Sequence, residues 1–442
     1  MAEPPISTLS GWGRHSARGR ELIGEDLEGL SERAHLSRGL GRSYGDSSLP
    51  ADQQEPVLNT RFADRILHFD EESGALRAEA GLSLSELNRL LMPRGYFTPV
   101  SPGTSFVTLG GMVAADVHGK NQHRAGNFGD HVTALRMRVG DGSIIECSPQ
   151  EHSDLFFGTI GGMGLTGHIL EVEFVLRRIP SEWVWQESRR IQDIDEFQDA
   201  LEEAATEWPY TMGWIDCLAR GKNMGRGILM TGDWAEADEA PPTPPKQGFR
   251  PSLRFEWPSW VLNGLTIRAF NELYYRKQWR RESQGIVSHA SFTYPLDAIR
   301  SWNRMYGHRG FTQYQCVLPR EAGRSSARRV LEVLTTRGGA SFLCVIKDFG
   351  REGRGVLSFP RPGITLALDV AVRDDTQALV DALNEQVLRE GGRIYLAKDS
   401  FTRREHFESM EGERLDRFRA VRDRWDPERR FRSAQSVRLL GE

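Results

Sequence analysis

The sequence predicts an α+β protein built from two domains. Its 442 residues exceed the length that one hydrophobic core usually organises. Residues 36–175 are rich in glycine and in short strand-like runs, whereas the region from residue 311 onward reads strand, helix, strand, strand, helix, strand. That order is typical of an antiparallel sheet backed by helices. We expect a first domain over 1–180, a second over 181–405, and a C-terminal segment, 406–442, that returns to the first through Trp425 and Phe431.

Short strands and one clear helix are predicted for the first domain. The helix follows Ser83, which stands three residues before Glu86 in the spacing of a capping box. Pro93 and Gly95 end this helix, because proline cannot continue a helix and glycine adopts the left-handed conformation of a C-cap. Runs rich in β-branched and alternating residues predict strands at 56–59, 66–69, 75–80, 134–139, 143–146 and 167–178.

The stretch 235–261 differs from the rest of the second domain, because its closely spaced prolines oppose both helix and sheet. We interpret it as a long loop or lid. Two interpretations of its aromatic residues remain open, contact with a lipid or membrane surface and packing onto the second domain; these residues are Phe249, Phe255, Trp257 and Trp260. Around this stretch we expect helices at 193–208, 320–337 and 376–390 and strands at 311–318, 341–347, 365–372 and 393–397.

Composition and charge argue against several classes of protein. A net charge of −4 provides no basic face, so nucleic acid is not an expected partner. The cysteines show neither the close pairs of a zinc site nor a disulfide framework, which favours a reducing compartment; they are Cys147, Cys217, Cys316 and Cys344. Residues 1–20 contain no apolar run. We therefore expect no signal peptide and no transmembrane segment, and a cytoplasmic protein with at most peripheral membrane contact.

Three glycine-rich loops mark the first domain, at 37–46, 101–111 and 158–167. Glycine lets backbone N–H groups approach a ligand closely, and a row of such groups binds a pyrophosphate. Taken singly, each loop is better explained as a tight turn between strands, since turns are where glycine usually lies. The third loop contains a G-x-G-x-x-G match from Gly162 to Gly167. A Rossmann fingerprint follows a strand and opens a helix, whereas a helical segment precedes this match and a strand-like one follows it, so we reject that interpretation.

Together the three loops resemble the vanillyl-alcohol oxidase (p-cresol methylhydroxylase) type of FAD-binding domain. The residues that carry this resemblance are RGLGRSYGD at 38–46, SPGTS at 101–105, LGG at 109–111, AADVHGKN at 114–121 and GGMGLTG at 161–167. Within that superfamily the chain resembles the decaprenylphosphoryl-ribose oxidases over roughly residues 10 to 440. That closer resemblance rests on HGKN at 118–121, WNRMY at 302–306, QYQ at 313–315, FPRPG at 359–363 and YLAKDS at 395–400.

The resemblance implies FAD as the cofactor, held between the two domains. Related sugar-lactone oxidases often bond the flavin to a histidine in the first loop, where this chain has Arg42. Arginine cannot form that bond, so we predict FAD that dissociates. The residues implied in cofactor binding are Arg38, Gly39, Leu40, Gly41, Arg42, Ser43, Tyr44, Gly45, Pro102, Gly103, Thr104, Thr108, Gly110, Gly111, Ala114, Asp116, His118, Gly119, Asn121, Gly162, Gly164, Thr166, Gly167, Ile169, Tyr395 and Lys398.

Three residues are candidates for catalysis. The resemblance places Lys398 near both flavin and sugar; without it, a surface lysine at the end of a strand is an equal interpretation. His118 is a candidate general base or flavin-positioning group, and its alternative is a turn residue beside glycine. Tyr44 is a candidate hydrogen-bonding group. A metal site at His118, His123 and His131 is not predicted, because their spacing fits no familiar ligand set.

Substrate contacts are expected on the second domain. Gln313 and Gln315 alternate onto one strand face, where two amides suit sugar hydroxyls; an ordinary polar sheet face is the alternative. Lys347 ends a strand and is a candidate for a substrate phosphate, and Asp369 and Asp399 are candidates for orienting these groups. No role is assigned to Ile364 or any further position. Mycobacterial relatives carry a cysteine where this chain has Ala367, so we predict resistance to reagents that form an adduct with that thiol.

The resemblance implies oxidation of the 2′-hydroxyl of a polyprenylphosphoryl-β-D-ribose to the 2′-keto sugar. That reaction is the first half of an epimerisation to arabinose, used in arabinan and cell-wall biosynthesis. The implied functional partner is an NAD(P)H-dependent short-chain reductase that completes it. Two alternatives stay open: an FAD-dependent oxidase or dehydrogenase of a soluble sugar, polyol or aldonolactone, and a flavin-free binding protein without enzymatic activity.

Overall fold

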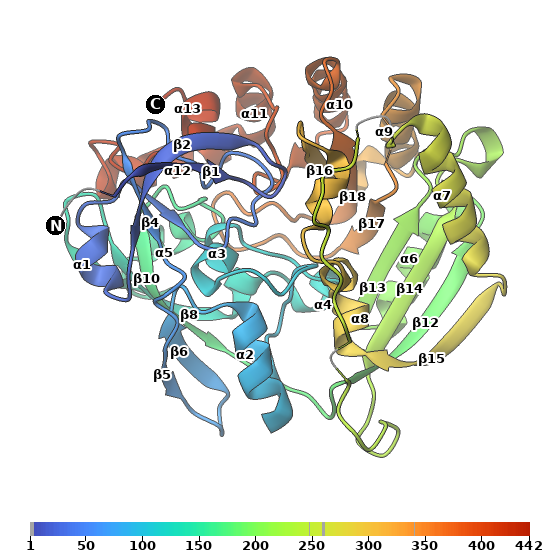
Figure 1. Cartoon of the computed structure of the whole chain (residues 1–442), viewed down its shortest axis with the longest axis horizontal. Helices are drawn as coiled ribbons and strands as arrows, with labels where there is room; N and C mark the ends of the chain where they lie inside the picture. The colour runs from blue at the N-terminus through green and yellow to red at the C-terminus, as the bar shows by residue number, and fades with distance from the viewer. Residues whose placement is uncertain (1–3, 247, 259–260, 340) are drawn as a thin grey trace.

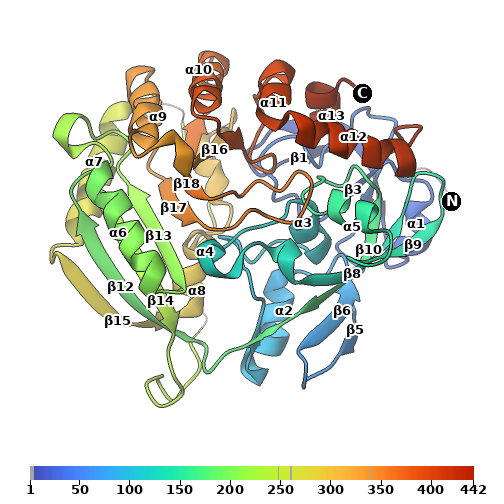
Figure 2. The same cartoon turned by 180° about the vertical axis from the view of Figure 1, so that it is seen from behind.

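The computed structural model describes residues 4–246, 248–258, 261–339 and 341–442. Small sheets and short helices form the N-terminal part, and one large sheet with its helices forms most of the remainder (Figure 1). The C-terminal helices lie along the N-terminal part, as the reverse view also shows (Figure 2). Within the described ranges, no helix combines the length and the apolar composition that crossing a bilayer requires.

Two main sheets organise the N-terminal part. The first has four strands in the order β1 (Ile6–Ser10), β2 (Ser16–Ile23), β4 (Pro56–Asn59), β3 (Leu36–Arg38). The second is antiparallel and has five, in the order β5 (Ile66–Phe69), β6 (Ala75–Glu79), β10 (His168–Val175), β8 (Val132–Arg138), β9 (Ile144–Cys147). A two-stranded sheet joins β7 (Tyr96–Phe97) to β11 (Arg177–Arg178). The predicted strands are confirmed, whereas β1, β2, β3 and β7 had not been predicted.

The helix predicted after Ser83 is α2 (Leu84–Leu91), and its N-cap is half of the expected capping box. The Ser83 hydroxyl accepts a hydrogen bond from the Glu86 N–H at 3.2 Å. The reciprocal bond was a wrong prediction, because the Glu86 carboxylate binds Arg89 instead, at 2.9 Å. Gly95 ends the following turn with a φ of 81°. The other helices of this part are α1 (Leu27–Ser31), α3 (Leu109–Ala114), α4 (Gln122–Ala125) and α5 (Ser153–Thr159).

The G-x-G-x-x-G match at Gly162 lies outside any strand–helix turn. Helix α5 ends just before it, and strand β10 begins directly after Gly167. Rejection of the Rossmann interpretation is therefore confirmed.

The large sheet is antiparallel and has eight strands. Their order is β15 (Glu282–Ser288), β12 (Trp183–Ile191), β14 (Gly227–Trp234), β13 (Tyr210–Ile215), β17 (Cys344–Phe349), β18 (Gly363–Ala371), β16 (Phe311–Pro319), β19 (Arg393–Ile394). The predicted antiparallel strands from residue 311 onward are confirmed. The sheet is wider than expected, because β12 to β15 extend it from a region where no strand had been predicted.

The two faces of the large sheet are covered differently. One face packs against α6 (Ile194–Glu207), α9 (Ser325–Thr336) and α10 (Thr376–Arg389) in a shared hydrophobic cluster. Helix α7 (Gly264–Lys277) lies on the opposite face (Figures 1 and 2). Gly213 faces Phe197 of α6, whereas the ring of the next residue, Trp214, lies 4.7 Å from the ring of Tyr274 on α7, centre to centre. Short helical turns connect these elements, among them α8 (His289–Thr293), Pro295–Ala298 and Trp302–Tyr306.

The proline-rich stretch 235–261 contains no helix or named strand among its described residues, which confirms the predicted irregular segment. Phe249 and Phe255 are exposed, at 93% and 81% of their surface. Trp257 is less exposed, and its backbone N–H donates a hydrogen bond to the carbonyl of Arg304. Trp260, the fourth aromatic residue of the prediction, lies outside the described residues.

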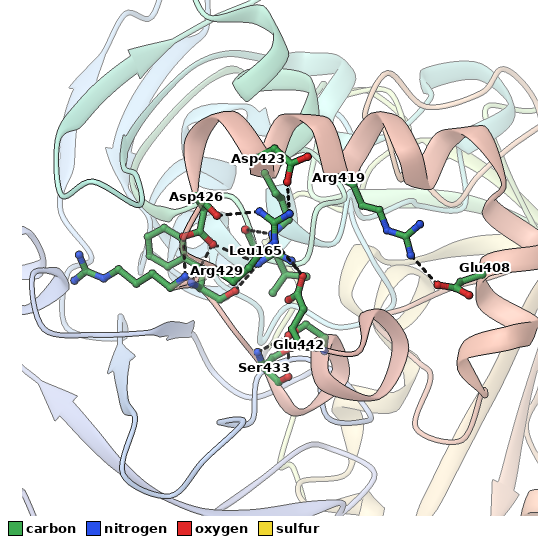
Figure 3. A network of polar contacts seen from close by, with 12 residues as sticks. Leu165, Glu408, Arg419, Asp423, Asp426, Arg429, Ser433 and Glu442 are labelled. Atoms are coloured by element: carbon green, nitrogen blue, oxygen red, sulfur yellow. Dashed lines mark hydrogen bonds and ion pairs between the residues drawn. The ribbon is translucent and has the colours of Figure 1, made fainter.

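The C-terminal segment comprises α11 (Arg404–Glu411), α12 (Glu413–Trp425) and α13 (Ala434–Leu440). Several of its side chains contact the N-terminal part, and one of them, Arg422, is fully buried. Figure 3 shows the polar network that includes Leu165, Asp426 and Glu442. The Arg422 guanidinium donates to the carbonyl of Leu165 at 2.9 Å and to that of Phe431 at 3.0 Å, and it pairs with Asp426 and Glu442. A residue of the C-terminal segment therefore holds the third glycine loop by a hydrogen bond to its backbone.

Candidate active site

A cavity of about 920 Å³ is lined by residues from both halves of the chain. All three glycine loops contribute to its wall, together with the α7-facing side of the large sheet and with α7 itself. Each loop is local in sequence, and each is also contacted by a later segment of the chain.

The first loop is held by the segment around residue 398. The N–H of Tyr44 donates to the carbonyl of Ala397 at 2.9 Å. Gly45 approaches Asp399 so closely that an added Cβ would lie 1.8 Å from its carbonyl oxygen. Arg438 of α13 donates to the Asp46 carboxylate at 2.8 and 2.9 Å and to Asp399 at 2.8 Å. This network ties the loop to the residue that follows Lys398.

The second loop is anchored to the turn at Pro295–Ala298. Asp297 accepts hydrogen bonds from the Thr104 hydroxyl at 2.7 Å, the Ser105 N–H at 2.8 Å and the Ser105 hydroxyl at 2.9 Å. Thr108 caps α3 by accepting from the N–H of Gly111. Asp297 thus joins the two halves of the chain beside the cavity.

The third loop lies against α3. The N–H of Met163 donates to the carbonyl of Ala114 at 2.8 Å. Gly164 has a φ of 80°, in the left-handed region that favours glycine. An added Cβ there would meet no atom within 4 Å, so this position faces open space in the cavity.

Most predicted cofactor residues line the cavity, but six lie behind its wall. Asp116 is the clearest of these: its carboxylate accepts from Asn127 at 2.7 Å, Ser358 at 2.5 Å and the N–H of Gly129 at 3.0 Å. Burial raises the pKa of Asp116 to about 6. It supports the loops instead of facing a ligand. The other five outside the lining are Arg38, Gly45, Asn121, Gly162 and Thr166.

Strand register collects the predicted substrate residues on one sheet face. Gln313 of β16 is opposite Asp369 of β18, Gln315 is opposite Ala367, and Lys347 of β17 is opposite Thr365. Directly paired residues share a face in an antiparallel sheet, so all of these side chains face the cavity side. Tyr314 points the other way and donates to Asn384 of α10 at 2.9 Å.

Lys398 lies above Tyr44 and near a buried carboxylate. Its Nζ is 3.6 Å from the centre of the Tyr44 ring. Asp369 accepts from Gln313 at 2.5 Å and from the Tyr306 hydroxyl at 3.1 Å. Burial lowers the pKa of Lys398, the Asp369 carboxylate opposes this, and burial raises the pKa of Asp369. A lysine with a lowered pKa can hold a neutral amine near pH 7 and accept a proton.

His118 is buried and uncharged. Burial, with the positive charges of Lys347 and Lys398, holds its pKa well below the usual range. Gln315 donates its amide to Nε2 at 3.0 Å and to the Thr365 hydroxyl at 3.3 Å. That arrangement assigns the ring proton to Nδ1, which has no hydrogen-bond partner among the described residues. His118, a residue of the cavity wall, thus holds one N–H donor without a partner among the described residues.

Lys120 is a cavity residue that the sequence analysis missed, although it lies within the quoted segment 114–121. Its ammonium donates to the carbonyl of Phe292 and lies 4.5 Å from the centre of that ring. Burial lowers the pKa of Lys120 to about 7, and the charge of Lys347 contributes to this shift. Burial also lowers the pKa of Lys347, to about 8. Lys120 and Lys347 both line the cavity, and an anionic ligand beside them would favour their protonated forms.

Unsatisfied polar atoms in the cavity wall fit the polar groups of the implied cofactor. The buried Nε of Arg42, Oγ of Ser47 and Nδ1 of His118 have no partner among the described residues, and all three residues line the cavity. Such groups are normally paired, so they indicate a polar ligand. The Arg42 guanidinium is also stacked 4.0 Å from the centre of the Trp12 ring.

Ala367 lies in the cavity wall, and no cysteine belongs to its described lining. Cys147, Cys217, Cys316 and Cys344 are all buried. Burial raises the pKa of Cys316 to about 12, which keeps the thiol protonated and unreactive.

The histidines near the second loop have separate partners. His123 Nε2 bonds the carbonyl of Trp208, and His131 Nε2 bonds that of Ala125, each at 2.9 Å. His118 bonds Gln315 instead, so the three rings do not converge on a shared ligand.

Comparison with known proteins adds to this geometry. Residues 31–148 match a family described as FAD binding domain. The chain is 33% identical to a decaprenylphosphoryl-β-D-ribose oxidase of Mycolicibacterium smegmatis, over 99% of this chain and 98% of that protein. It is 33% identical to an uncharacterised protein of Streptomyces coelicolor, over 81% of this chain and all of that one. A Δ(24)-sterol reductase of Rattus norvegicus is 31% identical over 26% of this chain and 22% of its own.

Proposed function

The chain belongs to the family of decaprenylphosphoryl-β-D-ribose oxidases, and on this premise we propose that it uses FAD to oxidise the 2′-hydroxyl of a polyprenylphosphoryl-β-D-ribose to the 2′-keto sugar. The observation that carries the proposal is one cavity in which the three glycine loops meet the sheet face of Gln313, Gln315 and Lys347. FAD, when bound, supplies the two-electron oxidant.

Lys398 is the proposed proton acceptor. Burial in the cavity favours its neutral amine, which can take the proton of the sugar hydroxyl. Tyr44 is held beneath it as a neutral phenol, since burial and the nearby Asp369 raise the pKa of Tyr44 well above its usual value. His118 is the proposed hydrogen-bond donor that positions cofactor or sugar, in place of the general base that the sequence also allowed.

Gln313 and Gln315 are the proposed ligands of the sugar hydroxyls, and Lys120 and Lys347 those of the substrate phosphate. The two lysines are close enough that the charge of Lys347 lowers the pKa of Lys120. A phosphate bound between Lys120 and Lys347 would pair with both ammonium groups and so offset the cost of burying their charges. The wall formed by β13, β14 and α7 is suited to an isoprenoid chain, because most of its residues are apolar; they include Met212, Trp214, Met230, Ile267 and Phe270.

Arg42, Ser47 and the backbone N–H groups of the three loops are the proposed cofactor ligands, and the flavin is proposed to be non-covalent because position 42 is arginine.

The functional partner of the protein and its cellular location are proposals as well. An NAD(P)H-dependent short-chain reductase would reduce the keto sugar and complete the epimerisation. The protein would work in the cytoplasm, in peripheral contact with the membrane that holds its substrate.

The test is an absorption spectrum of the purified protein followed by anaerobic titration with candidate sugars. We expect a flavin spectrum that bleaches with a lipid-linked phosphoribose and not with soluble sugars. Bleaching by soluble sugars or aldonolactones alone would instead support an FAD-dependent oxidase or dehydrogenase with a soluble substrate. A protein that binds no flavin would leave only a non-enzymatic role.

A further inference from the structure

Helix α7 has two apolar faces. Its inner face lines the cavity with Ile267, Phe270 and Tyr274. Its outer face carries Leu265, Ala269 and Leu273 at a spacing of four residues, and Leu265 and Leu273 are 77% and 72% exposed. A helix on the surface of a soluble domain normally turns polar residues outward. Figures 1 and 2 show α7 at the margin of the molecule, on the side of the large sheet opposite α6.

The surroundings of the outer face are basic. Residues 264–282 contain five arginine and lysine residues and two glutamates, and one of the arginines, Arg281, pairs with Glu196 at 3.3 Å. One of the glutamates, Glu272, already accepts from Arg226 at 2.6 Å and from Arg276 at 2.5 Å. Trp279, two residues beyond the helix end, is 74% exposed. An apolar stripe with cationic flanks and a tryptophan is the composition of a helix that lies in the interface of an anionic membrane.

We propose that this outer face, which we call the α7 surface and define by Leu265, Ala269, Leu273 and Trp279, docks on an anionic lipid bilayer. The inference rests on the proposed function, because a lipid-linked substrate has to reach the cavity from a bilayer. The same helix forms the cavity wall through Ile267, Phe270 and Tyr274, so docking places the cavity beside the membrane surface. The basic flanks complement anionic head groups, and a substrate carried by a lipid requires access from a bilayer, so a bilayer is the occupant that both observations favour.

The test is vesicle sedimentation of the full chain. Vesicles of phosphatidylglycerol mixed with phosphatidylcholine should pellet the wild-type protein, and added salt should weaken this binding. The double variant Leu265→Ser/Leu273→Ser should bind these vesicles at least about tenfold more weakly, because two exposed leucines no longer leave water. The matched control is Leu67→Ser/Leu90→Ser, whose leucines are 45% and 38% exposed on β5 and α2, away from α7. It should bind like wild type.

A second arm tests the charge and the orientation. Arg268→Gln/Lys277→Gln should weaken binding to anionic vesicles while leaving binding to pure phosphatidylcholine unchanged. Lipids brominated on their acyl chains should quench Trp279 fluorescence, and Trp279→Phe should remove that part of the quenching. Wild-type protein that stays in the supernatant, or a leucine double variant that pellets like wild type, would overturn the proposal; the former outcome would leave a protein partner for this face.

Failure of docking and failure of the proposed function give different results. Vesicle binding requires no turnover, and a water-soluble short-chain analogue of the substrate requires no vesicle. Unchanged bleaching by the analogue in Leu265→Ser/Leu273→Ser, with lost vesicle binding, is the expected pattern. Bleaching without vesicle binding in wild type refutes docking alone, and vesicle binding without bleaching refutes the proposed function alone.

Discussion

The Arg438 network offers a prediction whose size follows from its geometry. Arg438→Ala removes the cation that donates to Asp46 at 2.8 and 2.9 Å and to Asp399 at 2.8 Å. The two carboxylates are only 4% and 7% exposed, so water cannot replace the lost partner. Breaking a buried pair in this way costs about 3 to 5 kcal/mol. Because Arg438 itself is 24% exposed, we take about 3 kcal/mol for the loss.

Calorimetry converts this loss into a shift of the thermal midpoint. With an unfolding entropy of about 2.1 cal/mol/K per residue, 442 residues give about 0.9 kcal/mol/K, so the midpoint should fall by about 3 °C. The variant should also release flavin more readily, because Asp46 ends the first loop and Asp399 follows Lys398.

Arg419→Ala is the matched control. Arg419 binds Glu408 at 2.7 Å in the same C-terminal segment, but the two side chains are 38% and 37% exposed (Figure 3). Water replaces an exposed partner, so this midpoint should stay almost unchanged. An Arg438→Ala midpoint equal to that of Arg419→Ala would refute the reasoning that the buried network stabilises the site.

Four further predictions concern the cavity. Lys398→Met and Lys398→Arg should each lower turnover about 10²- to 10⁴-fold in stopped-flow reduction, since neither side chain accepts a proton near neutral pH; a wild-type rate in either excludes the base. Activity should rise with pH through the lowered pKa of Lys398. Asp369→Asn removes the charge that raises this pKa, so the rising limb of the pH–rate profile should move to lower pH by about one to three units. A profile that moves to higher pH contradicts the assignment of Lys398 as the base. Acid precipitation should leave the flavin in the supernatant, because Arg42 cannot hold it covalently, and a yellow pellet would show a bond. Native wild-type protein should form no adduct with thiol-selective reagents by mass spectrometry, whereas Ala367→Cys should gain one at the cavity wall; labelling of a native cysteine would contradict the burial argument.

Local patterns made parts of the site predictable. Alternation along β16 put Gln313 and Gln315 on one face and Tyr314 on the other, because side-chain direction in a strand depends only on position parity. The three glycine loops were found because their function needs glycine in a short segment. In both cases the determining interaction lies within a few residues.

Interactions across the chain were not predictable in this way. Lys120 gains its altered pKa from burial and from Lys347, 227 positions later, and nothing in its own segment indicates this. Strands β12 to β15 lack strong alternation and gain their stability from pairing within the wide sheet. The inner and outer faces of α7 differ only once the sheet beneath it is present.

The contacts that hold the glycine loops also have a consequence for the order of folding during synthesis. Asp297 holds the second loop, Arg422 the third, and Arg438 the first, and all three emerge from the ribosome long after the loops themselves. Nascent chains are lengthened from the N-terminus, so the loops wait in an unfinished state while the large sheet is synthesised. Capture of the cofactor is therefore a late step of maturation, and flavin bound to a chain in the cell marks it as one that has finished folding.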